Sequence, residues 1–195
     1  TDRGSSGRDG LFVDCTDHWK GRIGNTAVSF AKHAGGVLRL GTDGPDRRTG
    51  LATTALLMGA RVRLDCRSEP GAADHGQTVL LRQENDPAPR FEFLEEGCVR
   101  LGMRVSFDLR DDAGHYHGDG RQDVWVYPEG DVHVTTSLQL VDLAGHGLLR
   151  DAWLEARAAG AGPPVWRGAN RESLAGGRPV RWSFGTDLAE RALLL

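Results

Sequence analysis

The sequence predicts an all-β protein, a two-sheet antiparallel β-sandwich with short helices near its C-terminus. Apolar and polar residues alternate over long stretches, glycine-rich turns separate these stretches at strand spacing, and few segments have helical periodicity. The 195 residues are enough for one domain with a buried core. We expect a polar tail at residues 1–10, the sandwich at residues 11–145 and a mixed helix and loop extension of the same domain at residues 146–195.

Two stretches carry the clearest alternation. Every odd-numbered residue from Val99 to Leu109 is apolar, and every even-numbered residue from Leu56 to Cys66 is apolar. This spacing is typical of half-buried antiparallel strands, because successive side chains of a strand point to opposite faces. Shorter apolar runs predict further strands at residues 11–15, 27–31, 36–40, 77–82 and 90–94.

The last quarter of the chain has a different pattern. Leu149, Ala152, Trp153 and Ala156 follow helical spacing, which favours a helix over residues 151–159, although a strand also fits. Asp187 and Glu190 then form a capping-box pattern that predicts a short terminal helix.

Charge and composition exclude several classes of function. The net charge is −3, so we expect no nucleic-acid partner. No run approaches the roughly 18 apolar residues of a membrane span, so we expect none. The three cysteines form no C-x-x-C pair, which argues against a thiolate zinc site, and no cofactor is expected.

The strongest local prediction is a hairpin around Pro128 and Gly130. Proline sets the first central residue of a type I turn, and glycine takes the left-handed position that follows. The predicted register places Trp125 opposite His133, and one face of the hairpin belongs to the core. The other face carries a mixture of aromatic and polar residues: Arg121, Asp123, Trp125, Tyr127, His133 and Thr135.

This mixture favours sugar binding. Aromatic rings such as Trp125 and Tyr127 can stack on the apolar face of a pyranose, and neighbouring polar groups can bond its hydroxyls. The alternative is a solvated outer face whose tryptophan is covered by a loop, because aromatic residues favour strands in any case. The sequence leaves the location open, and the carbohydrate hypothesis favours a secreted or cell-surface protein.

The sequence His115-Tyr116-His117 invites a metal hypothesis, since two histidines two residues apart on a strand share a face. The P-x-G-x-x-H pattern ending at His133 also resembles a fragment of the cupins, which are metal-binding barrels. In the predicted register, however, His117 lies about 26 Å from His133, too far for shared ligation. We therefore expect no metal, and we expect His115 and His117 to be polar residues near a turn. A metal site at these two histidines is the weaker alternative.

A second cluster of polar and aromatic residues follows the first strand. Asp14, Asp17, His18 and Trp19 could line a cleft, or could form an ordinary loop anchored by one tryptophan.

Residues 36–44 and 60–64 resemble the opening of concanavalin-like jelly-roll domains, two-sheet sandwiches that bind or cleave glycans. A long hairpin at residues 104–142 would also suit the larger sandwich of polysaccharide lyases and sugar mutarotases. The E-x-D-x-E strand of jelly-roll glycosidases is absent, so the resemblance implies no catalytic pair of carboxylates.

Three functions remain open. The first is a carbohydrate-recognition domain of a glycan-processing system, which binds sugar on the face around Trp125. The second is a sugar-acting enzyme of lyase or mutarotase type, in which His133 or His117 is the base, Tyr127 assists and Arg121 offsets a substrate carboxylate. The third is a structural domain whose tryptophan-bearing face packs against a partner protein or a neighbouring domain.

Overall fold

The chain folds as an antiparallel β-protein, so the predicted all-β class is confirmed. The computed structural model describes residues 9–43, 51–66, 76–141, 147–158, 166–167, 173–174 and 180–181, and side chains within 9–41, 58–65, 76–141 and 149–155. The strands are β1 (Leu11–Asp14), β2 (His18–Ile23), β3 (Thr26–Ala31), β4 (Leu38–Asp43), β5 (Leu51–Cys66), β6 (Thr78–Arg82), β7 (Arg90–Glu95), β8 (Leu101–Arg110), β9 (Tyr116–Val126), β10 (Val132–Leu140), β11 (Gly147–Ala158), β12 (Trp166–Arg167), β13 (Ser173–Leu174) and β14 (Val180–Arg181). Two 3₁₀ turns, η1 (Ala34–Gly36) and η2 (Gln83–Asn85), are the only helical elements of the described residues.

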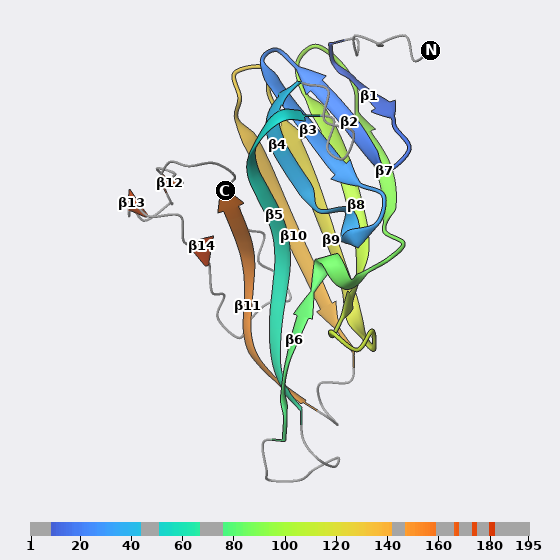
Figure 1. Ribbon diagram of the computed structural model, residues 1–195, viewed down its shortest axis with the longest axis vertical. Coiled ribbons are helices and arrows are strands. Elements are labelled where there is room, and N and C mark those ends of the chain that lie inside the picture. The colour runs from blue at the N-terminus through green and yellow to red at the C-terminus, as the bar shows by residue number, and fades with distance from the viewer. Residues whose placement is uncertain are drawn as a thin grey trace.

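Hydrogen bonds join twelve strands into one sheet, in the order β1-β2-β3-β4-β5-β6-β8-β9-β10. Strand β7 pairs with β8, and β11 pairs with β5 and β14 (Figure 1). Most neighbours in the sheet are also neighbours in sequence, which is the order of a meander. Neither the division into two separate sheets nor the jelly-roll connections are confirmed.

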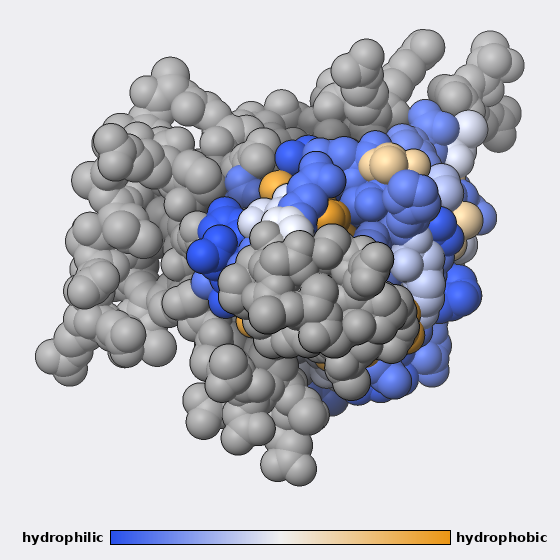
Figure 2. Space-filling view, turned by 90° about the horizontal axis from the view of Figure 1, so that it is seen from below, coloured by the Kyte–Doolittle hydropathy of each residue, from blue (hydrophilic) through white to orange (hydrophobic). Residues whose placement is uncertain are grey.

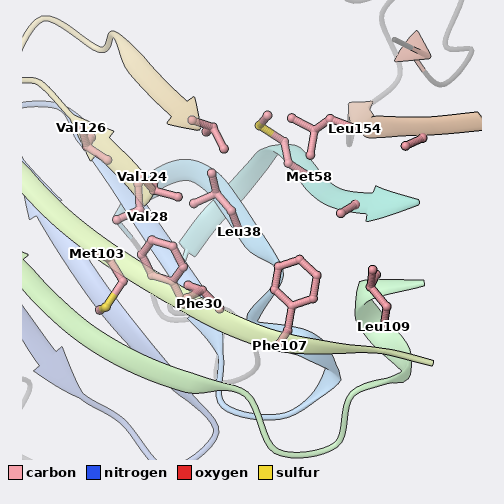
Figure 3. Packing of buried hydrophobic residues seen from close by; sticks show 14 of the residues in the cluster. Val28, Phe30, Leu38, Met58, Met103, Phe107, Leu109, Val124, Val126 and Leu154 are labelled. Atoms are coloured by element: carbon pink, nitrogen blue, oxygen red, sulfur yellow. The ribbon is translucent and has the colours of Figure 1, made fainter. Parts of the chain in front are cut away.

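The core lies where the β2–β4 part of the sheet faces β8 and β9. A side chain at Gly21 of β2 would come within 3.0 Å of Leu101 of β8, and one at Gly36 would come within 2.4 Å of Val105. In Figure 3, Val28 and Phe30 point into the same space as Met103 and Val124. The alternating residues from 101 to 109 and from 58 to 64 contribute to this core as predicted, but Val99 lies before β8 and is 67% exposed.

Buried polar side chains tie the two parts together. The Gln83 side-chain amide donates to the Gly35 carbonyl at 2.8 Å and to Gln122 Oε1 at 3.1 Å, while Gln83 Oε1 accepts from the Ala60 N–H at 2.8 Å. Because both the amide nitrogen and the carbonyl oxygen of Gln83 have partners, this network stabilises one packing of β5 and β9.

The predicted helix over residues 151–159 is wrong, because this stretch belongs to strand β11 (Figure 1). Ala152 and Leu154 join the core, whereas Trp153 and Glu155 point to the other face and are also buried. Glu155 forms a 2.8 Å ion pair with Arg61 of β5. A strand buried on both faces loses the polar half of its alternation, so the sequence pattern there is ambiguous. The predicted terminal helix at Asp187 lies outside the described residues.

The end of the molecule seen in Figure 2 presents mainly hydrophilic described residues, with a few isolated hydrophobic ones. Isolated apolar residues are normal on a protein surface. Within the part of the chain that the structure describes, no helix is long and apolar enough to cross a membrane.

Candidate functional site: the outer face of β8–β10

The hairpin between β9 and β10 has the predicted geometry. The Tyr127 N–H donates to the Asp131 carbonyl at 2.9 Å, and the Gly130 N–H donates to the Tyr127 carbonyl at 3.0 Å. Gly130 has a φ of 98°, the left-handed conformation that favours glycine. Trp125 pairs with His133 as expected, and this register continues without a shift to the pairing of Gly118 with Leu140.

The pairing sorts the hairpin side chains onto two faces. Val124, Val126 and Val134 are at most 1% exposed and form part of the core, which confirms the predicted inner face. We call the opposite side the Trp125 face. It comprises Arg100, Arg104, Arg121, Asp123, Trp125, Tyr127, His133 and Thr135.

Trp125 lies against the neighbouring strand. It pairs with Gly102 of β8, and a side chain at Gly102 would come within 2.5 Å of Trp125 Cζ3. Arg100 places its guanidinium over the indole, with Cζ 4.3 Å from the ring centroid. The tryptophan is therefore held between a glycine and a cation, an arrangement that fixes its position.

Arg100 connects Trp125 to a second aromatic pair. Its Nε donates to Glu95 at 2.7 Å, and it also hydrogen-bonds Tyr127. These contacts, with Tyr127 first, raise the pKa of Arg100. The Tyr127 ring lies 5.2 Å from the His133 ring between centroids. Trp125, Arg100, Tyr127 and His133 thus form one connected cluster at the hairpin end of the face.

A row of ion pairs crosses the strands next to this cluster. Arg104 binds Asp123 through two parallel hydrogen bonds of 2.8 and 2.9 Å and also contacts Glu92 at 3.2 Å. The bonds to Asp123 raise the pKa of Arg104. Arg121 lies 3.9 Å from Asp123 with its side chain 52% exposed, and Thr135 pairs with Asp123 across the strands.

The structure therefore brings together only some of the site residues that the sequence predicts. Trp125, Tyr127 and His133 meet, and Asp123 with Thr135 lies in the next row. Arg121 pairs with Ser137, four positions along β9 from Trp125, or about 13 Å away. Sequence reasoning missed Arg100 and Gly102. Neither residue belongs to a recognisable motif, and both reach the cluster because β8 pairs with β9.

His115 and His117 form a separate site at the other end of β9. His115 Nδ1 and His117 Nε2 lie 3.0 and 3.3 Å from the same oxygen of Asp111, whose second oxygen accepts the N–H groups of Ala113 and His115. Burial opposes ionisation of Asp111, but the bonds from His115 and His117 outweigh it and lower its pKa to about 2.

These histidines cannot share a site with His133. Val141 bonds the His117 carbonyl at 3.0 Å, so β10 separates the two regions by eight residues, or about 26 Å. The β8–β9 register shifts between Leu109, which pairs with Gly118, and Arg110, which pairs with Tyr116. Among the described residues, no three His, Cys, Asp or Glu side chains are arranged to hold a metal ion.

The cluster predicted after the first strand is not a loop. His18 and Trp19 begin β2, where His18 is buried and Trp19 packs against Phe93 with ring centroids 4.9 Å apart. Lys32 lies over the Trp19 ring at 4.8 Å and pairs with Asp14. Trp19 is thus part of an aromatic contact between β2 and β7.

No protein-family model matches the chain, and no curated protein matches it. The function is therefore inferred from the residues of the site.

Proposed function

We propose that the Trp125 face binds carbohydrate, as a recognition domain of a glycan-processing system. The proposal rests on one observation: Trp125 and Tyr127 contact Arg100, and His133 contacts Tyr127, at one end of a partly exposed sheet face. Aromatic surface beside a few fixed polar groups is the usual composition of a small-ligand site.

The fixed positions of these groups support binding. Trp125 rests over Gly102 and Arg100 is held by Glu95, so little side-chain entropy is lost when a ligand binds. The neighbouring row of Arg104, Asp123 and Thr135 offers hydrogen-bond donors and acceptors to sugar hydroxyls.

The test is a thermal-shift screen against neutral and acidic oligosaccharides, followed by calorimetric titration of the hits. A ligand at about 100 times its dissociation constant adds about 2.7 kcal/mol to stability. We expect one sugar class to stabilise the protein, and Trp125→Ala to abolish the shift. Tyr116→Ala is the matched control, because Tyr116 is an exposed aromatic residue at the other end of β9.

Equal affinity in Trp125→Ala and the native protein would overturn the proposal. A flat screen combined with a changed oligomeric state in Trp125→Ala would instead favour a face that packs against a partner protein.

A sugar-acting enzyme is the second candidate, favoured by the contact between Tyr127 and His133 beside Arg100. In this scheme His133 is the base and Tyr127 assists, while Arg100 takes the role first given to Arg121, that of offsetting a substrate carboxylate. Turnover that is lost in His133→Gln and Tyr127→Phe, with sugar binding retained, would establish it. Binding without turnover by the native protein would exclude it.

A further inference from the structure

The outer face of β2, β3 and β4 has small residues in the middle and basic residues on both sides. Ala27, Ser29 and Ala31 of β3 point to this face and are fully buried. Ser29 pairs with Lys20 of β2 on one side and with Arg39 of β4 on the other. Ser29 therefore lies between two basic residues of the neighbouring strands.

Among the described residues, two buried side chains on this face lack hydrogen-bond partners. His18 is 4% exposed, and neither of its ring nitrogens has a hydrogen-bond partner. Ser29 is fully buried, and its hydroxyl has none either. His18 pairs with Ala31, so it lies diagonal to Ser29, within side-chain reach. Buried polar groups are nearly always hydrogen-bonded, so these orphaned atoms call for a ligand.

The charge around these atoms is mostly positive. His18 experiences the positive charges of Lys20, Arg39 and Lys32 and the negative charge of Asp17. Burial first, and then Lys20 and Arg39, lowers the pKa of His18. Lys20 and Arg39 make further interactions of their own. Their charge nevertheless favours an anion near the imidazole.

We propose that His18 and Ser29 form an oxyanion-binding site on the outer face of β2–β4. The Ser29 hydroxyl and a ring N–H of His18 donate to the oxygens of a sulfate, phosphate or carboxylate group, and Lys20 and Arg39 supply the positive field. Such charge-assisted hydrogen bonds are stronger than hydrogen bonds between neutral groups. The site is independent of the Trp125 face, because it lies on the other part of the sheet and on different strands.

Thermal unfolding in sodium sulfate and in sodium phosphate, each against sodium chloride at matched ionic strength, tests the proposal. We expect a saturable rise of Tm with an oxyanion and not with chloride. Sulfate also stabilises proteins in general by exclusion from their surface, an effect that does not saturate. Ser29→Ala should weaken the apparent affinity about tenfold or more. Ser106→Ala, a serine on the outer face of β8, should leave it unchanged.

The imidazole signals of His18 in an NMR pH titration give a second, direct readout. Bound oxyanion favours the protonated ring, so sulfate should raise the pKa of His18 in the native protein and leave it unchanged in Ser29→Ala. Titration of His18 that is the same in sulfate and chloride, or a saturable Tm rise that persists in Ser29→Ala, would overturn the proposal. A difference between the sulfate and phosphate arms identifies the preferred anion.

Discussion

At one end of β9, Trp125 and Tyr127 lie against Arg100 and face solvent in part, whereas at the other end His115 and His117 both contact Asp111. Both ends combine aromatic and titratable residues. The two ends differ in the part of the structure that these residues stabilise. The Asp111 bonds close the turn between β8 and β9, since its carboxylate also accepts two backbone N–H groups of that turn.

This difference shows that the contacts of a histidine, more than its spacing in the sequence, indicate whether it belongs to a binding site. At Asp111 the carboxylate oxygens are used by groups of the turn and by His117 at the start of β9, which is typical of a structural lock. At the hairpin end the contacts of Trp125 and Arg100 join strands β8 and β9 and leave the cluster at a surface. We therefore assign binding to the hairpin end.

The largest expected effect comes from the middle of β9, where one substitution should damage both ends together. A side chain at Gly120 would come within 2.1 Å of the Phe107 ring, which is fully buried. Gly120→Ala should therefore cost about 3 kcal/mol of unfolding free energy, because the core must shift. Chemical denaturation measures this. Gly97→Ala is the control, since nothing lies within 4 Å of that position; equal stability of the two variants would contradict the packing.

The lock at Asp111 should appear as acid sensitivity. Its pKa of about 2 in the folded protein lies below the ordinary value of 3.8, so the ionised carboxylate stabilises the fold above pH 3.8. That contribution, at most about 2 kcal/mol, is lost as the pH falls from 3.8 toward 2. Asp111→Asn should be less stable at pH 7 and should lose less stability over this interval. Parallel pH profiles of the two proteins would contradict the lock.

Gly102→Ala sharpens the assignment at the hairpin end. The new methyl group would displace Trp125, whose Cζ3 lies 2.5 Å from its position. Because Trp125 is only partly buried, we expect a stability loss of only about 1 kcal/mol but a clear change in near-ultraviolet circular dichroism. Sugar binding should fall with it. An unchanged spectrum would mean that Trp125 does not rest on Gly102.

The smallest effect is expected at Tyr116. Its hydroxyl donates to Asp119 at 2.9 Å, and this bond, followed by burial, raises the pKa of the phenol. Tyr116→Phe should change stability by less than about 0.5 kcal/mol, because the residue is exposed. An absorbance titration should show that the variant lacks a tyrosine ionising above the usual pH.

The hairpin could be predicted residue by residue because two local signals agree. The turn at Pro128 and Gly130 fixes the pairing, and the alternation of Val124 and Val126 fixes the faces. Arg100 and Asp111 were not predicted, since their roles depend on pairings that join separate segments. The sequence favours a helix over a strand at β11 because Trp153, on the second face of the strand, is buried as well, which weakens the polar alternation.

The most direct test of carbohydrate binding is an NMR titration with the oligosaccharides that stabilise the protein. We predict saturable shifts of the Trp125 indole N–H and of the backbone amides of Gly102 and His133, with no change at Tyr116 or His117. Shifts centred on His117, or sugar binding that leaves the Trp125 indole unmoved, would contradict the assignment of the binding surface to the hairpin end of β9.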